Sequence, residues 1–70
     1  MNAIASERKR LGLSQEELAE KMGCDRSTII RWEADTSRVA GGRLCDMADL
    51  FGCSIDYLLG RTDDRLPVSR

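Results

Sequence analysis

Residues 14–33, SQEELAEKMGCDRSTIIRWE, constrain the fold most strongly, because they predict two short helices joined by a tight turn. Ser14, with Glu17 three residues later, forms a capping box and predicts a helix start. Gly23 stands where that helix would end in a left-handed residue. Asp25 is expected to be the N-cap of the second helix, with its carboxylate accepting hydrogen bonds from first-turn amides.

The helix expected at 25–34 has an inward and an outward face, because helical periodicity separates its apolar side chains from the rest. Ile29, followed by Trp32 or Glu33, gives the inward stripe. The outward face then carries Arg26, Ser27, Ile30 and Arg31. This arrangement indicates a surface that contacts another molecule.

The segment resembles the Cro/repressor-type (XRE) helix-turn-helix proteins of bacteria and phages. The signature of that family is matched by Leu18, Ala19, Met22, Gly23, Cys24, Ile29 and Trp32. The similarity extends from about Ile4 to Gly60. It implies an all-α, compact five-helix lambda-repressor-like DNA-binding domain at 1–60, with the helix-turn-helix formed by helices 2 and 3.

The composition agrees with one small helical domain. Seventy residues lie near the lower limit for a single core, and the one proline and the absence of alternating β-branched runs disfavour strands. The expected helix 4 covers about 43–51, after a polar loop at 35–42, and a short helix follows at 55–59. From Arg61 the periodicity is lost, so 61–70 is expected to be a flexible tail.

The net charge of −1 predicts modest affinity from phosphate neutralisation alone. Residues 1–43 hold eight basic and seven acidic side chains, whereas residues 44–70 hold three and five. The part of the chain with the motif is therefore slightly basic.

Three cysteines without any histidine argue against a metal site or a metal cofactor, and their odd number argues against a disulfide scaffold. Cys24, Cys45 and Cys53 are each expected to be reduced, buried hydrophobes. No segment is apolar enough to span a membrane, and 1–11 is too charged for a signal peptide. A cytoplasmic location is expected.

The resemblance implies which side chains read DNA bases. The contact positions of the family fall on Arg26, Ser27 and Arg31, and either Thr28 or Ile30 is expected to add an apolar contact to a thymine methyl group. Two arginines favour guanine, because each guanidinium can donate two hydrogen bonds to O6 and N7. A phosphate contact is the alternative for either arginine.

Phosphate contacts are expected from Gln15, because relatives use the side chain at this position to bind a DNA phosphate. Arg38 and Arg43, which flank the helix expected at 25–34, are also expected to contact phosphates. For the two arginines, ordinary surface charge is the alternative. The resemblance also implies a bidentate, partly buried ion pair between Arg8 and Glu33, which would join a first helix expected at about 3–11 to the helix at 25–34. The alternative is that both are solvated surface charges.

Relatives dimerise near helix 5, which implies an interface at Ile55, Tyr57 and Leu58. Alternatively, Ile55 and Leu58 close the core and leave Tyr57 outside, so that the domain is monomeric until it meets DNA. Weak or DNA-assisted homodimerisation is the favoured hypothesis.

The expected function is that of a sequence-specific transcriptional regulator, most simply a repressor, that binds double-stranded DNA. The alternative is an antitoxin or another protein-binding regulatory module on the same fold. An enzyme is disfavoured because the chain has no histidine, no nucleophile–base arrangement and no phosphate-cradling glycine loop.

Overall fold

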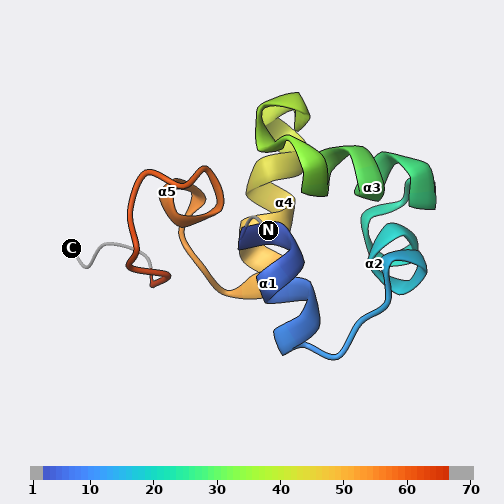
Figure 1. The fold of residues 1–70 in the computed structure, drawn as a ribbon, viewed down its shortest axis with the longest axis horizontal. Helices are drawn as coiled ribbons and strands as arrows, with labels where there is room; N and C mark the ends of the chain where they lie inside the picture. Colours follow the sequence, from blue (N-terminus) through green and yellow to red (C-terminus); the bar gives the residue numbers. More distant parts are fainter. Residues whose placement is uncertain (1–2, 67–70) are drawn as a thin grey trace.

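The computed structural model describes residues 3–66, and these form five α-helices and one 3-10 turn, without any strand. The elements are α1 (Ala3–Arg10), α2 (Gln15–Met22), α3 (Arg26–Ala34), η1 (Thr36–Arg38), α4 (Gly41–Phe51) and α5 (Ile55–Leu58). Figure 1 shows α2 and α3 at one end of the molecule and α5 at the other, with α1 and α4 between them. The all-α prediction is confirmed.

One core joins all five helices. Its largest fully buried side chains are Ile4, Leu18, Ile29, Met47 and Leu58, one from each helix. Burying a side chain of this size stabilises the fold by about 1.5 to 3 kcal/mol. Each short helix is therefore fixed by at least one residue at the common centre.

The start and the end of α2 follow the predicted pattern. The Ser14 hydroxyl accepts a hydrogen bond from the Glu17 amide at 3.0 Å, and the Glu17 carboxylate accepts one from the Ser14 amide at 2.8 Å. Gly23 ends the helix at φ +70°, a backbone conformation that favours glycine. The Cys24 amide then donates to the Ala19 carbonyl at 2.9 Å, which closes the turn. The tight connection to α3 thus has a local cause.

The expectation for Asp25 is wrong in one respect. Asp25 is the N-cap of α3 with an extended backbone, but its side chain makes no capping hydrogen bond. Its backbone carbonyl instead accepts from the Thr28 amide at 3.0 Å. The exposed Asp25 carboxylate therefore leaves the first amides of α3 without a side-chain cap.

The loop that begins at residue 35 differs from the expected polar connection. The Asp35 carboxylate accepts hydrogen bonds from the Ser37 hydroxyl at 2.7 Å and from the Ser37 amide at 3.1 Å, at the start of the η1 turn. These two hydrogen bonds, the hydroxyl first, lower the pKa of Asp35. Val39 is buried and fixes the loop to the core.

Helix α4 begins at Gly41, two residues before the expected start at Arg43. Glycine has a low helix propensity, which explains why the sequence did not predict this first turn.

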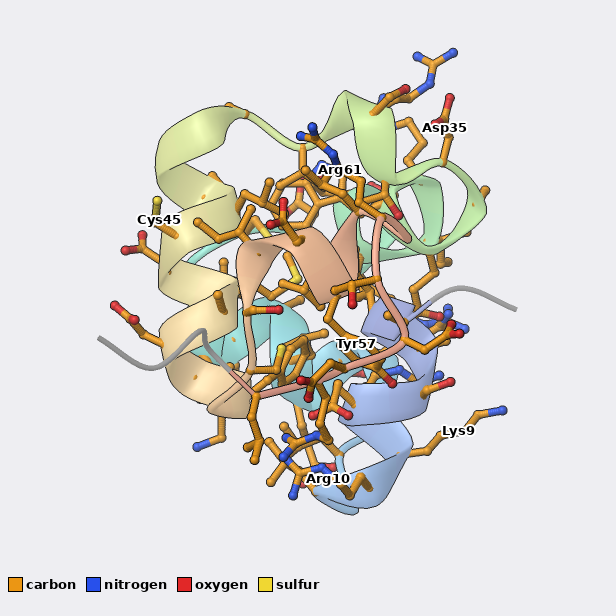
Figure 2. All side chains as sticks on the ribbon, turned by 90° about the vertical axis from the view of Figure 1, so that its left-hand side faces the viewer. Lys9, Arg10, Asp35, Cys45, Tyr57 and Arg61 are labelled. Atoms are coloured by element: carbon orange, nitrogen blue, oxygen red, sulfur yellow. The ribbon has the colours of Figure 1, made fainter. Side chains whose placement is uncertain are left out.

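The cysteines do not share one environment. Cys53 is buried, and burial raises the pKa of its thiol, so that the thiol stays protonated at neutral pH. Cys24 is half-buried against the core. Cys45 is exposed on the outer side of α4 (Figure 2), so its predicted burial is wrong. The inward positions of α4 are taken by Leu44, Met47, Ala48 and Phe51.

The segment after α5 folds back along α1 and α4. The Arg65 guanidinium donates to the Glu7 carboxylate at 2.6 and 3.2 Å and to the Phe51 carbonyl at 3.0 Å. Arg10 donates to the same two partners, at 3.0 and 2.7 Å. The division at residue 60 stays a prediction, but this contact at Arg65 was not expected of a flexible tail. Residues 67–70 of that tail lie outside the described residues.

Glu7 is expected to make stability depend on acid pH. Hydrogen bonds from Arg65, and then from Arg10, hold the pKa of this buried carboxyl below its ordinary value of 4.5, against the opposing effect of burial. Because folding lowers the pKa, this contribution to stability is present above pH 4.5 and is lost as the pH falls through the folded-state value. Urea unfolding should therefore separate wild type from Glu7→Gln more at pH 7 than at pH 3. Glu20→Gln, at an exposed site on α2, is the control; an equal wild type–Glu7→Gln difference at both pH values would contradict this account.

Candidate nucleic-acid interface

One face of α3 presents polar side chains to solvent, and the opposite face is buried and apolar. Arg26, Ser27 and Arg31 are exposed, and Ile29 and Trp32 are buried beneath them. The predicted inward stripe is therefore confirmed. Thr28 is half-buried beside this face, whereas Ile30 is an exposed apolar side chain on it. The helix offers hydrogen-bond donors and apolar surface on one accessible side.

Helix α2 positions this face. Within residues 3–66, the contact between α2 and α3 is more extensive than the contact between any other two elements. Ala19 is almost fully buried, and a small residue is required where two helices joined by a tight turn cross closely. The pair lies at one end of the molecule (Figure 1). The outer side of α3 is consequently not covered by α4 or α5.

Arg8 and Glu33 are brought together, as the resemblance implied. The Arg8 Nε donates to Glu33 Oε2 at 2.6 Å, and Nη2 donates to Oε1 at 3.4 Å. The side chains are only 12% and 10% exposed. Arg8 Nη1 also donates to the Leu13 carbonyl at 2.9 Å. The pair thus ties α1 to α3 and to the α1–α2 loop, and it neutralises the acidic residue near the end of α3.

Gln15 lies between the ion pair and the exposed face of α3. Its Nε2 donates to Glu33 Oε1 at 3.1 Å, and its Oε1 accepts from Arg26 Nη2 at 3.4 Å. The predicted phosphate ligand and a predicted base-reading residue are therefore in contact. Sequence reasoning missed both hydrogen bonds, because no local spacing connects the first turn of α2 to the two ends of α3.

The two other predicted phosphate ligands differ in their surroundings. Arg38 is 63% exposed and lies 3.8 Å from the Asp35 carboxylate, a distance that gives a weak ion pair at a surface. Arg43 is half-buried and donates to the Met22 carbonyl at the end of α2. That contact joins α4 to α2, so Arg43 has a structural partner in addition to any role toward DNA.

The predicted dimer residues are not presented as one apolar patch. Leu58 is 1% exposed and belongs to the core, so it is not available to a partner in this structure. Ile55 and Tyr57 are half-buried and pack against the core. Figure 2 shows Tyr57 on the face of α5 and the segment that follows it, and Figure 1 places this face opposite α2 and α3. Leu58 is the buried residue of α5, and its side chain closes the core.

Comparison with known proteins decides the family. A family model described as helix-turn-helix matches residues 4–58. The chain belongs to the helix-turn-helix family. The resemblance found in the sequence is confirmed, and the motif of this helix-turn-helix protein is formed by α2 and α3.

A relative of this helix-turn-helix protein is the Bacillus subtilis (strain 168) protein named "Uncharacterized HTH-type transcriptional regulator YobD". It is 40% identical over 60 residues, which are 86% of this chain and 54% of the relative. The chain therefore spans about half the length of that protein. No solved structure matches the chain significantly.

Metal-binding clusters and membrane-spanning helices are absent from residues 3–66. No group of three or more histidine, cysteine, aspartate or glutamate side chains in this range is placed to hold a metal ion. No helix within the same range is both long and apolar enough to cross a membrane. The exposed face of α3, within the helix-turn-helix motif, is therefore the candidate functional surface.

Proposed function

We propose that the chain is a sequence-specific DNA-binding transcriptional regulator, most simply a repressor that occludes a promoter. The observation that carries this proposal is the exposure of Arg26, Ser27 and Arg31 on one face of α3. An α-helix fits the major groove of DNA, and arginine can donate two hydrogen bonds to one guanine. Arg26 and Arg31 are assigned to guanines, with Thr28 beside them for a thymine methyl group.

Phosphate contacts would set the position of α3 in the groove. The start of α2, with Gln15, offers backbone donors and the positive end of a helix dipole. Arg38 is exposed and extends this surface beyond the end of α3. Arg43 contributes less than expected, because its guanidinium also bonds to α2. With a net charge of −1, the interface depends on these few side chains.

Dimerisation is proposed to be weak and assisted by DNA. One domain of this size covers few base pairs, so that useful affinity needs two copies on neighbouring half-sites. Ile55 and Tyr57 each keep part of their surface exposed, but Leu58 does not. With Leu58 in the core, the predicted interface loses one of its three residues, which favours association on DNA over a stable dimer in solution.

Selection from a random duplex pool, followed by footprinting, tests the function. The expected result is a guanine-containing half-site, with two protected half-sites about 10 base pairs apart. Protection of a single half-site would overturn the dimer proposal alone. If no sequence is enriched, the regulator proposal is wrong, and the protein-binding module of the antitoxin type becomes the leading function. Copurification with a second protein would then be the next observation to seek.

A further inference from the structure

We propose that residues 61–66 form a strap that opens and closes over α5, with Arg10 keeping the acceptors of Arg65 paired while the strap is open. The strap follows α5 and returns to α1 and α4, where Arg65 is bound. Figure 2 shows the segment after α5 beside Tyr57, on the face that has Arg61 at one end and Arg10 at the other. The strap therefore lies over one side of the domain.

The strap is fixed at its two ends and exposed between them. At its start, the Arg61 amide donates to the Asp56 carbonyl at 2.8 Å. Near its end, the Arg65 carbonyl accepts from the Ser54 amide at 2.8 Å. Residues 62–64 between these points are exposed to solvent. A segment of this kind can open locally with a free energy well below that of global unfolding.

The side chain of Arg65 binds two acceptors of the helical core. Its guanidinium donates to the Glu7 carboxylate at 2.6 and 3.2 Å and to the Phe51 carbonyl at 3.0 Å. The Glu7 side chain is only 4% exposed. A buried carboxylate without a partner is far more costly than a broken surface ion pair. With Arg65 as the sole partner of Glu7, the strap would be locked in place.

Arg10 supplies matching hydrogen bonds from α1. Its guanidinium donates at 3.0 Å to Glu7 Oε1, which Arg65 also binds, and at 2.7 Å to the Phe51 carbonyl. When Arg65 leaves, the Glu7 carboxylate keeps a cationic partner and the Phe51 carbonyl keeps a donor. The strap can therefore open without leaving either acceptor group unpaired.

Opening changes the accessible surface of α5. A hollow of about 330 Å³ is lined by Tyr57 and Leu59 from the region of α5 and by Thr62 and Asp63 from the strap. Because the strap forms part of the wall, its opening exposes more of Tyr57. Tyr57 belongs to the surface proposed for dimerisation, so the strap limits how much of that surface a second copy can reach. This consequence rests on the proposed function, whereas the opening itself does not.

Hydrogen exchange of the Ser54 amide measures the opening, because this amide donates to the Arg65 carbonyl. In wild type, its exchange rate is expected to be nearly independent of urea at low concentrations, since local opening exposes little surface. The amide of buried Met47 in α4 should instead exchange faster as urea is added. Equal urea dependence of the two amides would show that the strap does not open separately, and would overturn the proposal.

Two arginine variants test the shared acceptors, and neither changes the sequence next to Ser54. Arg65→Ala removes the contact that closes the strap and is expected to raise the Ser54 exchange rate by about 10-fold or more. Arg10→Ala is expected to lower this rate by about 10-fold, because opening would then leave buried Glu7 unpaired. Arg61→Ala removes an exposed side chain from the same segment and, as the matched control, should change the rate by less than about 3-fold.

A faster Ser54 exchange in Arg10→Ala, similar to that in Arg65→Ala, would overturn the proposal, because both arginines would then fix a static tail. Access to α5 is measured by the relaxation of the Tyr57 ring protons by a soluble gadolinium chelate. This relaxation should rise in Arg65→Ala and stay at the wild-type value in Arg61→Ala. Unchanged relaxation in Arg65→Ala would show that the strap does not cover α5. The urea series on wild type decides whether the strap opens even where a variant fails to fold.

Discussion

Replacing Glu33 by alanine is expected to lower the free energy of unfolding by about 3 kcal/mol. The change leaves the Arg8 guanidinium, which is only 12% exposed, without its carboxylate partner. Breaking a buried ion pair lowers the free energy of unfolding far more than breaking an exposed pair, for which about 0 to 1 kcal/mol is usual. For a domain of 70 residues, such a loss is a large part of the total stability.

Urea unfolding at pH 7 measures this effect. The control is Glu20→Ala, which removes an exposed carboxylate from α2 and should change the free energy of unfolding by less than about 0.5 kcal/mol. A double variant, Arg8→Met with Glu33→Leu, should recover part of the loss, because two apolar side chains replace the pair without leaving a charge. A Glu33→Ala variant as stable as the control would show that the pair does not hold α1 to α3.

The helix-turn-helix was predictable because its signals are local. Ser14 and Glu17 set the start of α2 by hydrogen bonds three residues apart, and Gly23 sets its end by a backbone conformation. Ile29 and Trp32 lie inward because their spacing matches the helical period. The exposed face of α3 followed directly from these signals.

The contacts that the sequence did not predict have a different cause, because they join distant parts of the chain. The Glu7–Arg65 ion pair joins residues that lie 58 positions apart. Gln15 reaches Glu33 across 18 positions, so its place between the ion pair and Arg26 was not visible in any local pattern. Glu7 shares a face of α1 with buried Ile4, and an acidic residue on an inward face was a signal that a partner existed.

Residue type alone was also insufficient where the surroundings decide burial. Cysteine is often buried, yet Cys45 lies on the outer side of α4. Leu58 was assigned both to a dimer interface and, alternatively, to the core, and it lies in the core. Aspartate favours N-cap positions, yet the Asp25 side chain does not bond to α3. For Cys45 and Leu58, the face of the helix on which the residue lies determines the outcome.

Replacing Arg26 and Arg31 by alanine is expected to remove most of the preference for the selected DNA. Each bidentate contact with guanine contributes about 1 to 3 kcal/mol of discrimination, or about 5- to 150-fold in relative affinity. Losses at separate base pairs add approximately, so the double variant should lose at least about 25-fold. If both arginines instead contact phosphates, their loss weakens all duplexes equally and lowers the salt slope by about one unit for each contact.

Arg61→Ala is the matched control for charge. It removes one positive side chain that is 71% exposed and lies on the face with α5 (Figure 2), away from α3. Its effect on affinity should be small and independent of the DNA sequence. A change in preference in this variant would show that the charge of the domain, and not the position of the side chain, controls the choice of site.

The most direct test is the ratio of dissociation constants for the selected duplex and for the same duplex with its guanines replaced. It is measured for wild type, Arg26→Ala, Arg31→Ala and the double variant at one salt concentration. Reading of bases by α3 predicts that each single variant lowers this preference by about 5-fold or more and that the double variant nearly abolishes it. An unchanged ratio in all three variants would contradict the claim that the exposed face of α3 selects the DNA site.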